Sequence, residues 1–209
     1  MKDRYGREID YLRISITDRC NLRCIYCMPE EGICQTAHKE ILTYDEIRRI
    51  CRCMTALGIK KIKLTGGEPL TRKDSAVLVR MLKELPGIEK VTLTTNGILL
   101  KEQMAELAEA GIDNINISLD TLNTEAFQKI TRREGLARVL EGLKEAMKYP
   151  QIGLKINCVP VLEDPENLIN LAGIARDNPI HVRFIEMMPI GYGKEFRFCG
   201  EDEICSVLE

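Results

Sequence analysis

The chain has no tryptophan, and aromatic residues make up only 5% of its 209 residues. Its core must therefore be built mainly from aliphatic side chains. No apolar run approaches the roughly 20 residues that a membrane-spanning helix requires, and Met1 to Tyr5 lacks the apolar stretch of a secretory signal. The net charge of −2 gives no electrostatic reason to expect nucleic-acid or membrane binding.

Cysteine, by contrast, is abundant, with nine residues. In a chain without a secretory signal, this number predicts reduced thiols in the cytoplasm rather than a disulfide framework. Hydrophobic residues make up 44% of the chain, which is an ordinary value for a globular protein with a sizeable core.

Three of the cysteines lie close together, at Cys20, Cys24 and Cys27, directly after an apolar, strand-like run. Thiolates are soft ligands that suit zinc, copper(I) and iron–sulfur clusters. A structural zinc ion or an ordinary iron–sulfur cluster takes four protein ligands, so three thiolates leave one position open for chemistry. A zinc knuckle completed by Cys34 or His38 is the alternative interpretation.

Apolar, β-branched runs alternate with helical patterns along the whole chain. This alternation predicts parallel strands covered by helices, and six units favour an α/β fold with a partial (β/α)6 TIM-like barrel, open on one side. The expected strands are 11–17, 60–65, 91–95, 114–119, 153–159 and 181–187. The expected helices begin after Thr43, which has the capping-box partner Glu46, and then cover 74–85, 102–110, 136–147, 165–176 and 202–208.

Polar and glycine-rich residues follow these strands, where parallel α/β folds place their active sites. Gly66, Gly67 and Glu68 follow the second strand; the glycines would let backbone approach a ligand, and Glu68 adds an acceptor. The third and fourth strands end near Thr94 and Ser118. Each residue alone is typical of an ordinary strand end. Their convergence on one rim of the predicted barrel favours a functional site there.

Four cations lie in strands among apolar neighbours, at Arg13, Lys63, Lys155 and Arg183. A buried charge is costly unless it is paired or meets a ligand. These cations could form a basic pocket for a polyanion such as a nucleotide triphosphate, within an otherwise aliphatic barrel. Alternatively, they pair with Glu68, Asp120 and Glu186.

The cysteine spacing and the Gly-Gly-Glu-Pro run resemble the signature of the radical S-adenosylmethionine (SAM) enzymes. Together with the Arg13–Pro29, Thr-Thr-Asn-Gly, Asn-Ile-Ser-Leu-Asp and Arg-Phe-Ile-Glu-Met-Met-Pro runs, they resemble the GTP 3′,8-cyclase family of molybdenum cofactor biosynthesis. The resemblance implies a lyase in which a 4Fe–4S cluster cleaves SAM to a 5′-deoxyadenosyl radical. That radical would take the ribose 3′ hydrogen of GTP and lead to 3′,8-cyclo-7,8-dihydro-GTP.

The resemblance also implies a role for individual residues. Cys20, Cys24 and Cys27 would hold the cluster, and no catalytic residue beyond these ligands is expected. The SAM site would comprise Tyr26, Gly66, Gly67, Glu68, Ser118 and Met188, and the GTP site Arg13, Lys63, Thr94 and Lys155. The family often has arginine where Lys63 stands, so the bidentate contact would be lost while the charge is kept.

The family continues beyond a core of this kind into a C-terminal part with three cysteines for a second cluster. Cys199 and Cys205 lack its C-x2-C spacing, so we expect residues 1–209 to form a radical SAM core domain without the second-cluster domain. The expected partners are GTP and a small-molecule or flavodoxin-type reductant, with a homodimer as an option. A radical SAM enzyme acting on another substrate, such as a peptide, and a non-catalytic metal-binding remnant are the alternatives.

Overall fold

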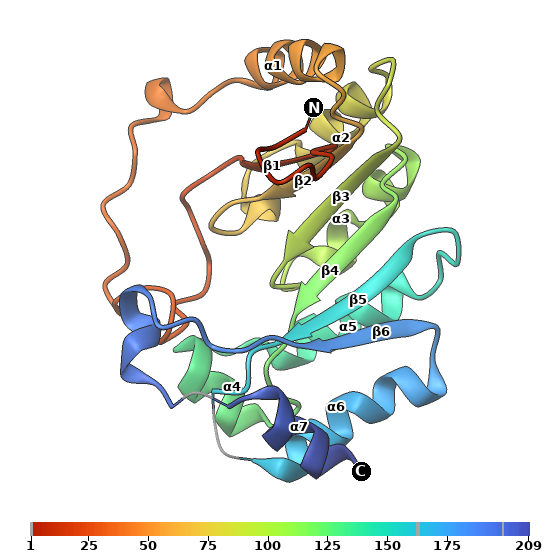
Figure 1. Ribbon diagram of the computed structural model, residues 1–209. Helices are drawn as coiled ribbons and strands as arrows, with labels where there is room; N and C mark the ends of the chain where they lie inside the picture. The colour runs from red at the N-terminus through yellow and green to blue at the C-terminus, as the bar shows by residue number, and fades with distance from the viewer. Residues whose placement is uncertain (1, 162–163, 198) are drawn as a thin grey trace.

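The computed structural model describes residues 2–161, 164–197 and 199–209. Its centre is one parallel sheet whose six strands follow chain order (Figure 1). The outer strands β1 and β6 do not pair with each other within the described chain, so the curved sheet stays open, as the sequence predicts. The strands are β1 (Tyr11–Ser15), β2 (Lys61–Thr65), β3 (Lys90–Thr95), β4 (Asn114–Ser118), β5 (Gly153–Cys158) and β6 (Ile180–Phe184).

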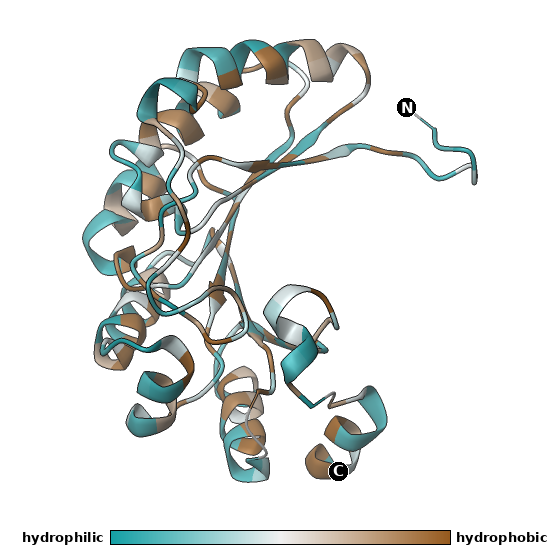
Figure 2. Ribbon diagram, turned by 90° about the vertical axis from the view of Figure 1, so that its left-hand side faces the viewer, coloured by the Kyte–Doolittle hydropathy of each residue, from teal (hydrophilic) through white to brown (hydrophobic). Residues whose placement is uncertain are grey.

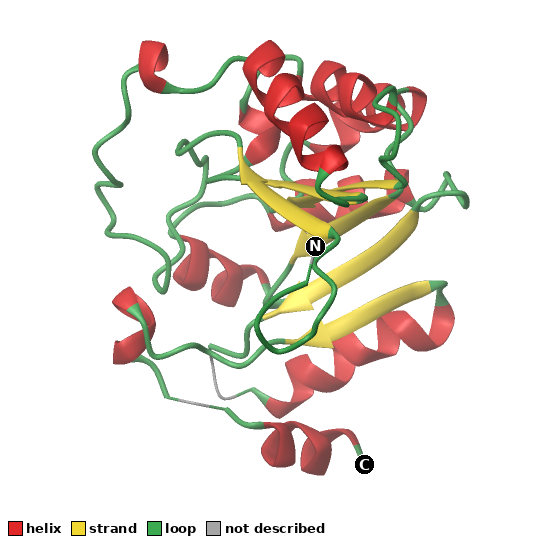
Figure 3. Ribbon diagram, turned by 45° about the horizontal axis from the view of Figure 1, so that its top comes forward, coloured by secondary structure: helices red, strands yellow, loops and turns green. Residues whose placement is uncertain are grey.

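Helices cover the convex side of this sheet, and the opposite, concave side is left uncovered over much of its length (Figures 2 and 3). All of the predicted helices are present, and α4 is an addition that the sequence analysis missed. The helices are α1 (Tyr44–Ala56), α2 (Ser75–Lys83), α3 (Leu100–Glu109), α4 (Thr124–Thr131), α5 (Leu136–Ala146), α6 (Pro165–Asp177) and α7 (Glu201–Leu208). In the described residues, 3-10 turns lie in strand-to-helix connections, namely η1 (His38–Glu40), η2 (Pro69–Thr71) and η3 (Gly191–Glu195).

Local chemistry explains where these helices begin and end. Thr43 and Glu46 form the predicted capping box at the start of α1, and each supplies an acceptor to the other's backbone N–H. Gly111 follows α3 with φ +83°, the left-handed conformation in which glycine has no steric penalty. The missed helix α4 begins at Asn123, whose side chain accepts the N–H of Ala126.

The core lies between the sheet and the helices. Ile62, Leu64 and Ile117 are fully buried, and each apolar strand residue alternates with a polar one that faces the other side. Burying each such side chain contributes about 1.5–3 kcal/mol. The expectation of an aliphatic barrel interior is therefore wrong. An open sheet has no opposite wall to exclude water, so its concave face carries polar side chains and its aliphatic residues face the helices.

None of the helices in the described part of the chain combines the length and the apolar character that crossing a membrane requires.

Candidate iron–sulfur and nucleotide site

The cysteine loop follows β1, and Cys20, Cys24 and Cys27 are free thiols on it. Cys20 and Cys24 are partly buried against the core, whereas Cys27 is exposed. The backbone turns tightly here, because the N–H groups of Cys27 and Met28 both bond to the carbonyl of Cys24, at 2.9 and 3.2 Å. This turn places two of the three thiols on one short arc.

The chemistry of these thiols fits an iron–sulfur cluster. Burial, together with the negative charges of Cys20 and Asp120, raises the pKa of Cys27 to about 11. Burial, then the charges of Cys27, Asp120 and Cys20, raise the pKa of Cys24 strongly. Burial, first of all, raises the pKa of all three thiols. Such thiols need a strongly cationic partner to become thiolates, and iron is such a partner.

Cys34 and His38, which would complete the alternative zinc knuckle, are both exposed. Within the described ranges no three His, Cys, Asp or Glu residues, the three loop cysteines included, are grouped as they would be around a single metal ion. Leu22 donates its N–H to the Cys20 sulfur at 3.4 Å, and the Asn96 amide points at the same sulfur from 3.9 Å. Hydrogen bonds to cluster sulfurs tune the potential of iron–sulfur centres.

Tyr26 joins the cysteine loop to the end of β4. Its hydroxyl donates a 2.6 Å hydrogen bond to the carboxylate of Asp120, which also accepts the Val159 N–H at 2.8 Å. Burial raises the pKa of Asp120 to about 6, and the two donors oppose this rise. The predicted SAM residue Tyr26 is thereby held between the loop and the sheet.

Gly66 and Gly67 lie against the backbone of the cysteine loop. The Gly67 N–H donates to Thr17 and the Glu68 N–H to Arg19, both at 2.7 Å. A Cβ on Gly66 would lie 2.6 Å from the Thr17 carbonyl oxygen, and one on Gly67 would overlap that of Arg19. The absence of Cβ atoms thus has a reason within the protein, in addition to the predicted contact with SAM.

Glu68 is 1% exposed, and its carboxylate accepts hydrogen bonds from Leu70, Thr95 and Asn96. Its hydrogen bonds connect the loop after β2 to the end of β3, and this contact stabilises the local structure. Ser118 lies partly buried at the end of β4, in register with Asn157, and Met188 is 62% exposed after β6. Their predicted contacts with SAM stay predictions.

The four cations gather on the concave face. Arg13 and Lys63 are in register on β1 and β2, and Arg183 donates to Asn157 at 2.7 Å. Burial lowers the pKa of Lys63, and the positive charges of Arg183, Arg13 and Lys155 lower it further. Thr94 lies on the same face, where its hydroxyl accepts a 3.4 Å hydrogen bond from Asn116.

The alternative in which carboxylates neutralise these cations is wrong. Glu68 and Asp120 accept their hydrogen bonds from the partners given above, and Glu186 is exposed without an ion pair to a described residue. A pocket of about 140 Å³ opens on the cationic face between the strands. A larger pocket of about 270 Å³, at α6 and α7, contains none of the predicted site residues. Lining the smaller pocket are Tyr11, Lys61, Lys63, Lys90, Thr92, Asn114, Asn116, Lys155 and Arg183.

Of the cysteines in the helices and strands, Cys51 and Cys158 are buried, as free cysteines commonly are, whereas Cys53 is exposed. The sequence analysis missed Arg132 at the end of α4, which contacts the cysteine loop. An arginine after a short helix carries no pattern that would have revealed this contact.

An open parallel barrel with three cysteines after its first strand defines a class of protein, and the comparisons agree. The sequence matches the radical SAM superfamily over residues 14–173, and the chain belongs to that superfamily. Its cofactors are those of the superfamily, a 4Fe–4S cluster and SAM. SuiB of Streptococcus suis, solved with S-adenosylmethionine, has a TM-score of 0.68 at 25% identity, over 84% of this chain and 38% of that one.

HydG, a maturase of the FeFe-hydrogenase, shares the fold with a TM-score of 0.71 at 14% identity, over 95% of this chain and 48% of that one. Among curated proteins, the GTP 3′,8-cyclase of Clostridium perfringens strain 13 is 46% identical over 211 residues, all of this chain and 65% of the relative. The GTP 3′,8-cyclase of Peptoclostridium acidaminophilum is 48% identical over 208 residues, which cover 97% of this chain and 64% of the relative. The family resemblance is confirmed, and this chain spans about 65% of the length of the curated relatives it matches.

Proposed function

We propose that this chain is a lyase of the GTP 3′,8-cyclase type that takes part in molybdenum cofactor biosynthesis. When bound, the cluster and SAM would supply the 5′-deoxyadenosyl radical that takes the ribose 3′ hydrogen of GTP. The relatives named above carry that activity in their names, and they support the assignment.

One observation carries the proposal, namely the four cations that share the concave face without an ion pair to any carboxylate in the described part of the chain. Burial, and then the positive charges of Arg183, Arg13 and Lys155, lower the pKa of Lys63, so its charge costs free energy in the free protein. A polyanion removes that cost when it binds, so the arrangement favours a nucleotide triphosphate over a neutral peptide.

The remaining roles follow from placement. Cys20, Cys24 and Cys27 would hold the cluster. The residues that would bind SAM beside it are Tyr26, Gly66, Gly67, Glu68, Ser118 and Met188, and Glu68 also braces the loop. Arg13, Lys63 and Lys155 would bind the phosphates of GTP, and Thr94 would add a hydroxyl on the same face. Lys63 offers a point charge without the planar fork of arginine.

The proposed activity is tested with 3′-deuterated GTP and the anaerobically reconstituted protein under dithionite. We expect SAM cleavage, with deuterium carried into 5′-deoxyadenosine. The triple variant Cys20→Ser, Cys24→Ser, Cys27→Ser is the control and should cleave no SAM. Cleavage without deuterium transfer, or transfer from a peptide instead, would point to another substrate, and tightly bound zinc would reject the enzyme assignment.

We also propose that residues 1–209 act as one radical SAM core domain in the cytoplasm, with a flavodoxin-type or small-molecule reductant and an optional homodimer. Limited proteolysis of the loaded protein should leave the core intact. The reductant is tested by mixing the protein with purified reduced flavodoxin and monitoring the EPR signal of the reduced cluster. The homodimer is tested by measuring the molar mass in light scattering.

A further inference from the structure

The cysteine loop is attached to the end of α4. The long segment between β1 and α1 descends to α4 (Figure 1), and two of its N–H groups bond to the last carbonyls of that helix. Arg23 donates to Thr131 and Ile25 to Ile130, each at 2.9 Å. The final carbonyls of a helix have no partner inside the helix, so the loop satisfies them.

Arg132 is the residue that caps α4, and its side chain completes this attachment. Its guanidinium donates to the carbonyl of Arg23 at 3.1 Å and to the carbonyl of Met28 at 2.9 Å. These two carbonyls bracket the segment that carries Cys24 and Cys27. A single nitrogen, Nη1, therefore joins both ends of the arc that holds two of the three thiols.

The backbone of Arg132 is in the left-handed conformation, with φ 55°. Glycine or asparagine is usual at this position after a helix, because other side chains meet a steric penalty there. Residues kept in such conformations cluster at functional sites, where the surrounding contacts hold them. Arginine at this position adds the guanidinium hydrogen bonds to the cysteine loop, which glycine could not form.

We propose that Arg132 is a positioning residue for the iron–sulfur cluster. Its guanidinium holds residues 23–28 in the arc that receives iron, so the loop loses little conformational freedom when the metal binds. The inference rests on the proposed role of Cys24 and Cys27 as cluster ligands, and it is independent of GTP as the substrate.

The helix itself does not depend on this side chain. Phe127 and Ile130 of α4 are 4% and 1% exposed, so the helix is anchored by apolar packing. Arg133 gives a matched control, because its guanidinium donates to the carbonyl of Arg132 at 2.7 Å rather than to the loop. Removing either guanidinium leaves the packed face of α4 unchanged.

The test compares the wild-type chain with Arg132→Gly and Arg133→Gln after anaerobic reconstitution. Glycine relieves the left-handed conformation, so any defect comes from the lost guanidinium. We expect Arg132→Gly to lose iron to a chelator about tenfold faster or more, since two charge-assisted hydrogen bonds are removed. Its apoprotein should melt within a few degrees of the wild type, and Arg133→Gln should match the wild type in both measurements.

Chemical rescue separates positioning from general stability. Guanidinium chloride at roughly 20 mM, far below denaturing concentrations, should slow iron loss from Arg132→Gly, and methylammonium should not. If Arg132→Gly does not fold, Arg132→Lys keeps the charge without the planar donor group and should lose iron at an intermediate rate.

Equal iron retention in Arg132→Gly and the wild type would overturn the inference. A defect that guanidinium does not correct, together with a lowered melting temperature, would also overturn it and assign Arg132 a structural role only. Failure of the wild-type chain to bind iron at all would instead reject the proposed function, and the inference with it.

Discussion

Substituting Gly67 with alanine should separate the two loops that build the cofactor site. A Cβ there would overlap the Arg19 carbonyl oxygen and lie 2.7 Å from that of Asp18. Backbone must move to relieve this overlap, because no flexible side chain is involved. The movement would lengthen the two 2.7 Å hydrogen bonds by which Gly67 and Glu68 hold the cysteine loop.

Two such bonds contribute about 1–3 kcal/mol together, and overpacking typically adds about 1–3 kcal/mol. Gly67→Ala should therefore destabilise the apoprotein by about 2–6 kcal/mol, which in a chain of this size lowers the melting temperature by about 4–24 °C. Circular dichroism on metal-free protein measures this effect without any contribution from the cluster.

Gly173 supplies the matched control. It lies inside α6, and a Cβ there would meet no atom within 4 Å. Gly173→Ala should stabilise the protein by about 0.5–1 kcal/mol, because alanine has the higher helix propensity. The reasoning is refuted if Gly67→Ala melts within about 2 °C of the wild type while the control behaves as expected.

Further predictions concern charge, pH and capping. Lys63→Met should leave the melting temperature of the apoprotein unchanged or higher, since burial and the neighbouring cations both disfavour the lysine charge. It should weaken GTP binding by about tenfold or more in calorimetry. A lower melting temperature with unchanged affinity would contradict this prediction. The pKa of Asp120 is raised to about 6, from 3.8 in the unfolded chain, so the folded protein binds more protons than the unfolded chain between these pH values. The free energy of unfolding should therefore fall as pH rises from about 4 to about 6, by up to about 3 kcal/mol. Asp120→Asn should abolish that slope in urea titrations, and an unchanged slope would reject the assignment. Thr43→Ala removes the capping box of α1 and should cost about 1 kcal/mol by the same assay, whereas Thr55→Ala, at the other end of α1, should cost less.

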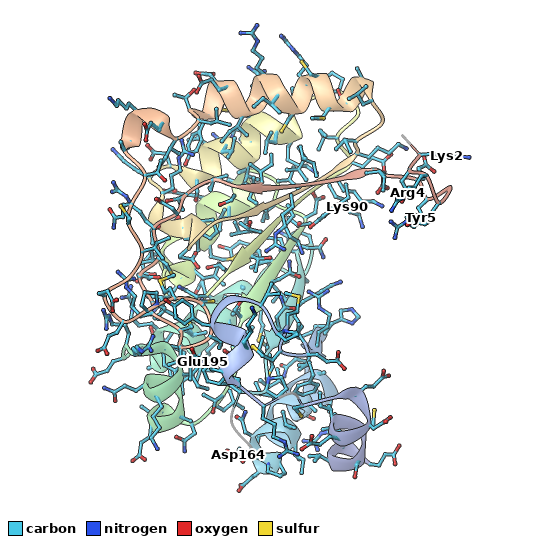
Figure 4. The ribbon with its side chains drawn as sticks, turned by 60° about the vertical axis from the view of Figure 1, so that its left-hand side comes forward. Lys2, Arg4, Tyr5, Lys90, Asp164 and Glu195 are labelled. Carbon is cyan, nitrogen blue, oxygen red and sulfur yellow. The ribbon has the colours of Figure 1, made fainter. Side chains whose placement is uncertain are left out.

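The basic surface extends toward the N-terminal ends of the strands. Lys90 at the start of β3 lies on the same side as Lys2, Arg4 and Tyr5 of the N-terminal arm (Figure 4). Lys61, in register with Lys90, is paired with Asp10 at 2.7 Å. The proposed nucleotide contacts Lys63 and Lys155 lie farther along the strands than Lys61 and Lys90.

The sequence could predict most of the fold, because strand and helix patterns are short-range. The alternation of apolar runs predicted all six strands to within a few residues, and Thr43 with Glu46 predicted the start of α1. It could not predict which face of the sheet would be polar. That outcome depends on whether a second wall covers the concave side, and spacing along one strand does not contain that information.

Cys20, Cys24 and Cys27 show what sequence alone determined, since their spacing places three soft ligands on one loop and predicts an open metal position. Tertiary structure decided what holds that loop, because the partners come from distant segments. Tyr26 meets Asp120 94 residues away, and Arg132 reaches Met28 across 104 residues. Such pairs form only when packing of the apolar helix faces brings the segments together, so no local pattern records them.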